Sequence, residues 1–156
     1  KNQLRLIHAF SPESHGSLSI IGDPAPNQLA YYEKCKEVGN PKGVNFYSSM
    51  PHEELVNHYK KAKVHCLPSF HETTGLVTLE AMAFGCQVLV GDLPIEREIF
   101  GTKANFVDPS SERSIKQGID HSLTLKNDHR EWILSNFYAD KVGESTWKLY
   151  REVLNK

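Results

Sequence analysis

The sequence contains little cysteine, and the thiols it has do not form a disulfide pattern. Cys35, Cys66 and Cys86 are its three cysteines, an odd number without a Cys-x-x-Cys pair, and no Asn-x-Ser/Thr glycosylation site is present. Secreted domains that rely on disulfides are rich in paired cysteines. The composition therefore argues against a secreted disulfide scaffold. It favours free thiols in a reducing compartment, so we expect a cytoplasmic protein.

A strong charge of either sign and long hydrophobic runs are also missing. The formal net charge is −1 and the isoelectric point is about 6.8, which gives no electrostatic footprint for nucleic acid or for an anionic membrane. No apolar run approaches the ~18 residues that mark a membrane span. We therefore expect no nucleic-acid partner, and peripheral membrane contact is the most that the sequence allows.

Two phosphate-binding fingerprints and a metal-ligand pattern are absent as well. The sequence contains neither Gly-x-Gly-x-x-Gly nor Gly-x4-Gly-Lys-Ser/Thr, which argues against NAD enzymes and P-loop NTPases. His65, Cys66 and His71 are close in sequence but lack the ligand spacing of a zinc site. We expect no metal ion and no cofactor.

Short apolar runs alternate with helical patterns along the chain. The runs predict strands buried on both faces, over Leu18–Ile21, Val44–Tyr47, Val64–Leu67, Val88–Val90 and Ala104–Val107. Helical patterns separate them, over Gln3–Phe10, Gln28–Glu37, Pro51–Ala62, Leu76–Phe84, a short segment after Pro94, and from Ser110 or Ser111 to about Leu123. The alternation predicts one α/β domain, a Rossmann-like three-layer sandwich with a parallel sheet.

The C-terminal segment, Arg130–Leu154, is rich in aromatic and aliphatic side chains, among them Trp132, Trp147 and Tyr150. Their spacing predicts one or two further helices. We expect these helices to pack on the core.

The segment from His65 to Gly91 is strongly apolar, yet it contains two acids. Glu72 and Glu80, eight positions apart, are its only Asp, Glu, Lys or Arg residues. Glu72 follows a predicted strand, which places it at the carboxyl edge of the sheet, where α/β folds bind ligands. Glu80 lies in a helix that is apolar on nearly every side, and such helices are buried. A lone carboxylate there costs several kcal/mol unless it is paired or hydrogen-bonded.

Two interpretations of these acids are open. In the structural one, Glu80 bonds a buried arginine, a backbone amide or a water, and Glu72 is an exposed loop acid. In the functional one, Glu80 accepts from the vicinal hydroxyls of a ribose and Glu72 contacts a bound sugar. The amides of Gly75, Leu76 and Val77, at a helix N-terminus, would then attract a diphosphate. Because the nearby sequence offers Glu80 no basic partner, we favour a ligand there. If Glu72 also contacts that ligand, the loop forms a nucleotide-sugar site.

The stretch "LPSFHETTGLVTLEAMAFGCQVLVGD" resembles the Glu-x7-Glu signature of retaining glycosyltransferases with the GT-B fold, of the group-one or family-four type. Glu72 and Glu80 match the two glutamates, and Pro68-Ser69, Gly75-Leu76 and Gly85 match the surrounding pattern. The likeness extends from the lysine-led helix "KNQLRLIHAF" to "ANFVDPSSERSIKQGI", and so over nearly the whole chain.

The resemblance implies a role for each of these residues. Glu80 would hold the nucleotide ribose, and Glu72 would contact the donor sugar near the reacting carbon, as the catalytic residue. Lys1 would neutralise the diphosphate leaving group. The remaining donor-binding residues that it implies are His71, Gly75, Leu76, Val77, Tyr47 and Ser48.

The sequence departs from the family pattern at two places. Thr73-Thr74 stand where the family often has Gly-Phe, which stiffens the loop. The family also has a central first strand and an N-terminal acceptor-binding domain before its lysine, whereas this sequence starts with Lys1. We therefore expect residues 1–156 to be the donor-binding domain of a longer enzyme. Peripheral contact with the inner face of the membrane would be made through the N-terminal domain. The family often has an acid where Glu96 and Glu98 follow Pro94.

The expected reaction is the transfer of a sugar from a nucleotide-diphosphate sugar to an acceptor, in surface polysaccharide or glycolipid synthesis. The fragment alone is expected to be inactive. Two alternatives stay open at this point: a GT-B sugar-nucleotide epimerase, and a non-catalytic α/β interaction module in which both glutamates are structural.

Overall fold

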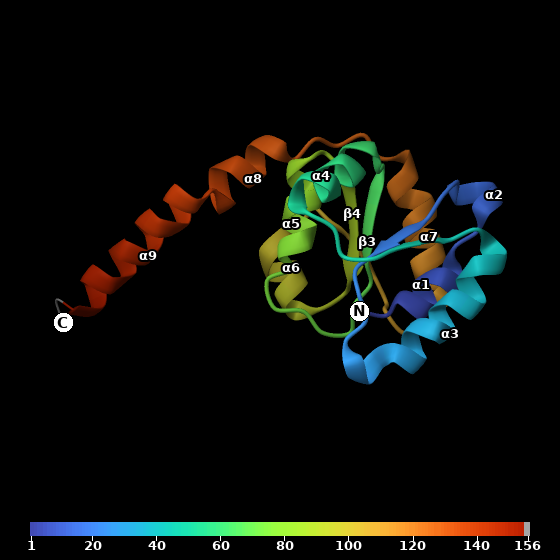
Figure 1. The fold of residues 1–156 in the computed structure, drawn as a ribbon. Coiled ribbons are helices and arrows are strands. Elements are labelled where there is room, and N and C mark those ends of the chain that lie inside the picture. The colour runs from blue at the N-terminus through green and yellow to red at the C-terminus, as the bar shows by residue number, and fades with distance from the viewer. Residues whose placement is uncertain (155–156) are drawn as a thin grey trace.

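Helices and strands alternate along the chain as the sequence predicts (Figure 1). The computed structural model describes residues 1–154. Its strands are β1 (Ser19–Ile21), β2 (Asn45–Tyr47), β3 (Val64–Leu67), β4 (Gln87–Gly91) and β5 (Asn105–Val107). Its helices are α1 (Gln3–Ala9), α2 (Pro12–His15), α3 (Leu29–Gly39), α4 (His52–Lys61), α5 (Leu76–Ala83), α6 (Pro94–Phe100), α7 (Glu112–Thr124), α8 (Arg130–Phe137) and α9 (Ala139–Leu154), with short 3-10 turns η1 (Pro26–Gln28) and η2 (Asn40–Lys42).

Every ladder between these strands is parallel, but the strands form two sheets. β1 pairs with β2, with Ile20 opposite Phe46. β4 lies between β3 and β5, with Leu89 opposite both Cys66 and Asn105. Parallel neighbours require crossover connections, which the intervening helices provide.

Helices cover both faces of the three-stranded sheet, which confirms the predicted three-layer arrangement. Leu89 of β4 packs with α1 and α7 in one cluster, together with Leu6 and Ile115. Val88 and Val90 face the opposite side and pack with α5, α6 and α8. The alternation follows from the period of two in a strand, and all five residues of β4 are buried. The helices on both faces of the sheet therefore pack against β4, and this packing positions the loops at the carboxyl edge of the sheet.

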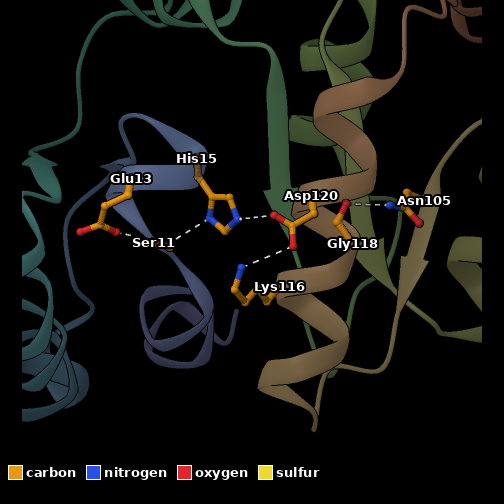
Figure 2. A network of polar contacts seen from close by, with 7 residues as sticks. All are labelled: Ser11, Glu13, His15, Asn105, Lys116, Gly118 and Asp120. Atoms are coloured by element: carbon orange, nitrogen blue, oxygen red, sulfur yellow. Dashed lines mark hydrogen bonds and ion pairs between the residues drawn. The ribbon is translucent and has the colours of Figure 1, made fainter.

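The short helix α2 was not predicted, because four residues carry no helical periodicity. Figure 2 shows the polar contacts that tie it to α7. The Nδ1 atom of His15 accepts from the Ser11 amide at 3.1 Å, so Nε2 carries the proton and donates to Asp120 at 2.9 Å. The hydrogen bond from His15 lowers the pKa of Asp120, and Lys116 adds to it. Since α2 directly precedes β1, this contact lies at the amino end of that strand.

The expectation that the C-terminal segment packs on the core is wrong for α9. Ile133 of α8 is buried, but no residue of α9 is. Trp147 and Tyr150 are each 57% exposed, and the helix projects away from the sheets (Figure 1). The apolar stripe of α9 has no partner within residues 1–154, so amphipathic spacing predicted the helix but not its packing. Within that same range no helix has both the length and the apolar character that crossing a membrane requires.

Candidate functional site

The loop of residues 68–75 leads from β3 into α5 at the carboxyl edge of the three-stranded sheet. Ser69 is fully buried in it, and the loop runs close against β4. A Cβ atom on Gly91 would lie 2.3 Å from the carbonyl oxygen of Ser69, so only glycine fits there. The loop ends at Gly75, the N-cap of α5, whose φ of 62° is the left-handed conformation that glycine adopts readily.

Glu72 is buried in this loop, which corrects the interpretation of it as an exposed acid. The residue is 9% exposed. Its Oε1 atom accepts from the Ser69 hydroxyl at 2.9 Å and from the Lys1 ammonium. Burial raises the pKa of Glu72, but the hydrogen bonds from Lys1 and Ser69 outweigh it and hold that pKa below its usual value. Glu72 is thus an ionised carboxylate in a nearly enclosed site.

Lys1 and Glu72, far apart in sequence, meet because Asn2 anchors the start of α1 beside the loop. The Asn2 side-chain amide donates to the carbonyl oxygens of Pro68 at 2.9 Å and Pro109 at 2.7 Å. Asn2 has a φ of 64°, a conformation in which asparagine is enriched. Lys1 keeps 52% of its side chain exposed, so the ammonium that pairs with Glu72 is also open to a ligand.

Glu80 is half-buried on α5, and no basic side chain pairs with it. Its Oε2 atom lies 3.5 Å from the Tyr59 hydroxyl, which is long for an O–H···O bond. Burial and the Glu80 charge raise the pKa of Tyr59 to about 12. In the part of the chain that the structure describes, no Lys, Arg or His nitrogen lies within the 4.0 Å of an ion pair with Glu80. Its carboxylate therefore keeps acceptor capacity for a ligand.

The first turn of α5 is exposed, which corrects the prediction of a helix buried on all sides. Leu76 is 66% and Val77 42% exposed, because this turn extends beyond the sheet edge. The first backbone hydrogen bonds of the helix are those from Thr78 and Leu79 to the Gly75 carbonyl. Among residues 1–154 no group accepts from the Leu76 or Val77 amide. These amides are the donors that an anion at a helix N-terminus needs.

The other predicted residues lie on neighbouring loops. Tyr47, 39% exposed, ends β2, and its ring lies 5.1 Å from that of His58. His58 precedes Tyr59 on α4, so this helix connects Tyr47 with Glu80. Ser48 is exposed after β2, and His71 is exposed in the loop of residues 68–75.

A cavity of about 730 Å³ opens beside Lys1, on the side of α1 and α3. Arg5 and Phe70 line it, with the Arg5 guanidinium 5.3 Å from the centre of the Phe70 ring. Neither Glu72 nor Glu80 lines this cavity, but Lys1, which does, pairs with Glu72. This cavity is therefore distinct from the space in front of the glutamates.

Two titratable groups with shifted pKa values lie beneath the loop, the half-buried His65 and the buried Glu96. Burial lowers the pKa of His65 to about 4, and its Nε2 atom lies 3.3 Å from the Thr78 hydroxyl. Glu96 of α6 is 1% exposed, and burial, with the Glu72 charge, raises its pKa to about 7. Glu98, the other acid expected near here, is exposed. Over residues 1–154 no three His, Cys, Asp or Glu side chains converge as metal ligands.

Comparison with known proteins gives a family match over most of the chain. The family model for glycosyl transferases group 1 matches residues 1–136. An uncharacterized glycosyltransferase of Methanocaldococcus jannaschii is 30% identical over 92% of the chain and 37% of its own length. D-inositol 3-phosphate glycosyltransferase of Corynebacterium glutamicum is 38% identical over 54% of the chain and 22% of its own length. The chain thus spans well under half the length of these curated relatives.

Solved structures share the fold at low sequence identity. Sucrose-phosphate synthase from Thermosynechococcus elongatus superposes with a TM-score of 0.81 at 24% identity, over 99% of this chain and 43% of its own. The C-terminal domain of a glycosyl transferase group 1 family protein from Francisella tularensis gives a TM-score of 0.72 at 19% identity, over 88% of this chain and 79% of its own. These neighbours are GT-B glycosyltransferases, which confirms the Rossmann-like C-terminal half of a GT-B fold.

Proposed function

Since the chain belongs to the group 1 glycosyl transferases, we propose that it is the donor-binding domain of a retaining enzyme. That enzyme moves a hexosyl group from a nucleotide-diphosphate sugar to an acceptor. One observation carries the proposal: Glu80 holds a half-buried carboxylate on an apolar helix, and no basic side chain among residues 1–154 pairs with it.

Glu80 is proposed to accept hydrogen bonds from the ribose hydroxyls of the nucleotide. A carboxylate offers two oxygens with about four lone-pair sites, which suits two vicinal hydroxyls. The single long contact with Tyr59 leaves most of these sites for the ligand. The exposed ring of Tyr47, with Ser48 beside it, is proposed to meet the base.

The diphosphate is proposed to bind between the N-terminus of α5 and Lys1. The Leu76 and Val77 amides supply hydrogen bonds, and the helix dipole adds attraction for an anion. As the bond from the sugar to the diphosphate breaks, negative charge grows on the leaving oxygen. Lys1 stabilises that charge once it turns from Glu72 toward the phosphate. The proposed mechanism uses no metal ion.

Glu72 is proposed to contact the donor sugar near the reacting carbon. In the unliganded chain its charge is held by Lys1 and Ser69. When Lys1 moves to the diphosphate, Glu72 regains an acceptor site for a sugar hydroxyl, and His71 lies beside it in the loop. The carboxylate is also proposed to stabilise positive charge that develops on the sugar ring.

The split sheet supports a proposal about the longer protein. Leu18, just before β1, and Val64 and Cys66 of β3 pack against the same cluster, yet β1 and β3 are not paired in the described chain. We place one further parallel strand between them, supplied by residues before Lys1. In a longer chain, the amides of Ile21 and Cys66, which point away from β2 and β4, should then be protected from hydrogen exchange. Rapid exchange of both would refute the added strand.

The complete enzyme is proposed to carry an N-terminal acceptor-binding domain and to act in surface polysaccharide or glycolipid synthesis. We further propose a cytoplasmic location, with peripheral membrane contact made through that domain. The short coverage of the relatives supports a longer protein. Without that domain the chain should bind nucleotide but transfer no sugar.

Calorimetric titration with UDP and with GDP tests the proposed donor site. We expect one of the two to bind the wild-type chain, and E80A to weaken binding by about tenfold to a hundredfold, the loss of a charge-assisted hydrogen bond. Glu131, exposed on α8, provides a matched control, and E131A should bind like the wild type. If neither nucleotide gives binding heat at about 1 mM, a concentration that would detect even weak binding, the result would favour a non-catalytic module instead.

A further inference from the structure

Glu96 is a buried carboxyl group without a hydrogen-bond partner, directly beneath the turn that leads into α5. The residue is 1% exposed, and neither side-chain oxygen has a partner in the described chain. A Cβ atom on Gly75 would lie 3.8 Å from Oε2 of Glu96 and 3.7 Å from the Thr78 hydroxyl. The carboxyl group therefore adjoins the turn that presents the α5 amides to the proposed diphosphate.

Two charged groups from neighbouring elements act on Glu96. Glu72, in the loop of residues 68–75, repels a negative charge on it, and Lys1, before α1, attracts one. Burial has the largest effect and, with the repulsion from Glu72, raises the pKa of Glu96 to about 7 against the opposing effect of Lys1. In the unliganded chain Glu96 is therefore divided between its neutral and charged forms near neutral pH.

Other titratable groups near Glu96 are already paired or exposed. Arg97, next to it on α6, is exposed and donates to Asp92, which precedes the helix, with a shortest contact of 2.5 Å. Glu98 is exposed on the same helix. His65 on β3 is uncharged at neutral pH, since burial lowers its pKa to about 4. The charge balance at Glu96 therefore depends chiefly on Glu72 and Lys1.

We propose that Glu96 is a positioning residue of the donor site and takes up a proton when a nucleotide diphosphate binds. The inference rests on the proposed function, in which the diphosphate draws the Lys1 ammonium away from Glu72. Removal of that cation leaves Glu72 and Glu96 as two carboxylates under one loop. A proton from the solvent neutralises Glu96 and so removes its repulsion with Glu72. The Gly75 turn then stays packed against the Glu96 carboxyl group.

The inference makes nucleotide affinity depend on pH in a defined direction. Because the bound state holds more protons than the free state, binding weakens as the pH rises above about 7, by up to about tenfold per pH unit. In E96Q the side chain is neutral at every pH and similar in shape, so this part of the pH dependence disappears. A residue with only a packing role would not change the pH dependence in this way.

Calorimetry with UDP or GDP, whichever binds, in HEPES and in Tris at pH 7.5 measures the proton count, because the two buffers differ in ionisation enthalpy. With a pKa of about 7, about three quarters of Glu96 is ionised at pH 7.5, so uptake reaches at most about 0.8 proton per nucleotide. We expect a measurable uptake by the wild type and by E98Q, and a smaller count for E96Q. E96L, neutral and apolar, serves as a second variant if E96Q misfolds.

The outcomes separate this inference from the proposed function. Nucleotide binding with a lower proton count in E96Q than in the wild type supports both. Binding with equal proton counts in the wild type, E96Q and E98Q overturns the role of Glu96 and leaves the donor site standing. Absence of binding by the folded wild-type chain overturns both.

Discussion

Substitution of Glu96 by glutamine should stabilise the unliganded chain, and the gain should increase with pH. Burial is the main cause that raises the pKa of this carboxyl from 4.5 to about 7 in the folded chain. Below pH 4.5 the group is protonated in both the folded and the unfolded state. As the pH rises from about 4.5 to 7, the unfolded chain loses this proton first, so the wild type loses stability. Above about pH 7 the loss is complete.

The magnitude follows from the size of the pKa change. Each pKa unit corresponds to about 1.4 kcal/mol, so between pH 5 and pH 8 the wild type loses about 2.5 kcal/mol relative to E96Q. For a domain of this size that difference amounts to roughly 5–10 °C in Tm. The amide of E96Q does not titrate, and all other groups contribute equally to both proteins.

Urea unfolding of the wild type, E96Q and E98Q at pH 5 and pH 8 measures this difference. Glu98 is exposed on the same helix, so E98Q should follow the wild type at both pH values. Parallel pH profiles for the wild type and E96Q would refute the reasoning, because they would show that the buried carboxyl titrates alike in both states.

Two further predictions concern the scaffold. G91A should lose about 1–3 kcal/mol of stability in urea unfolding, because its Cβ would lie 2.3 Å from the Ser69 carbonyl oxygen. G143A on α9, where nothing lies within 4 Å, should be neutral or slightly stabilising, and equal effects of the two would contradict the close approach. H15A should lose about 1 kcal/mol, the net worth of its bond to Asp120. It should bind nucleotide normally, since α2 precedes the amino end of β1, and weakened binding would show that the contact reaches the site.

Much of the fold could be predicted because its signals are local. The strand that became β3 was predicted with its observed bounds, and β4 was predicted one residue short at its start and at its end. Runs of apolar residues mark strands buried on both faces, and Ser111 caps α7 by accepting from the Ser114 amide. These features depend on residues a few positions apart. The exposure of α9 depends on what the rest of the chain offers it, which periodicity does not encode.

The candidate site, too, could be predicted from the sequence only where its signals are local. Glu72 and Glu80 stand out in the sequence because charge is rare around them. The burial of Glu72 and its pairing with Lys1 come from the anchor at Asn2, a contact between distant segments. Glu96 was expected only as one of two acids after Pro94. Helix packing alone buries it and exposes Glu98.

The central claim is that Glu80 is satisfied by the ribose hydroxyls of a nucleotide. The most direct measurement compares the affinities of the nucleoside diphosphate that binds and of its 2′,3′-dideoxy analogue for the wild type and for E80A. We predict that the wild type prefers the hydroxylated nucleotide by at least about tenfold, the worth of one charge-assisted hydrogen bond. E80A should bind the two equally and keep the wild-type Tm. The same preference in both proteins, or a lower Tm of E80A with unchanged affinity, would contradict the claim.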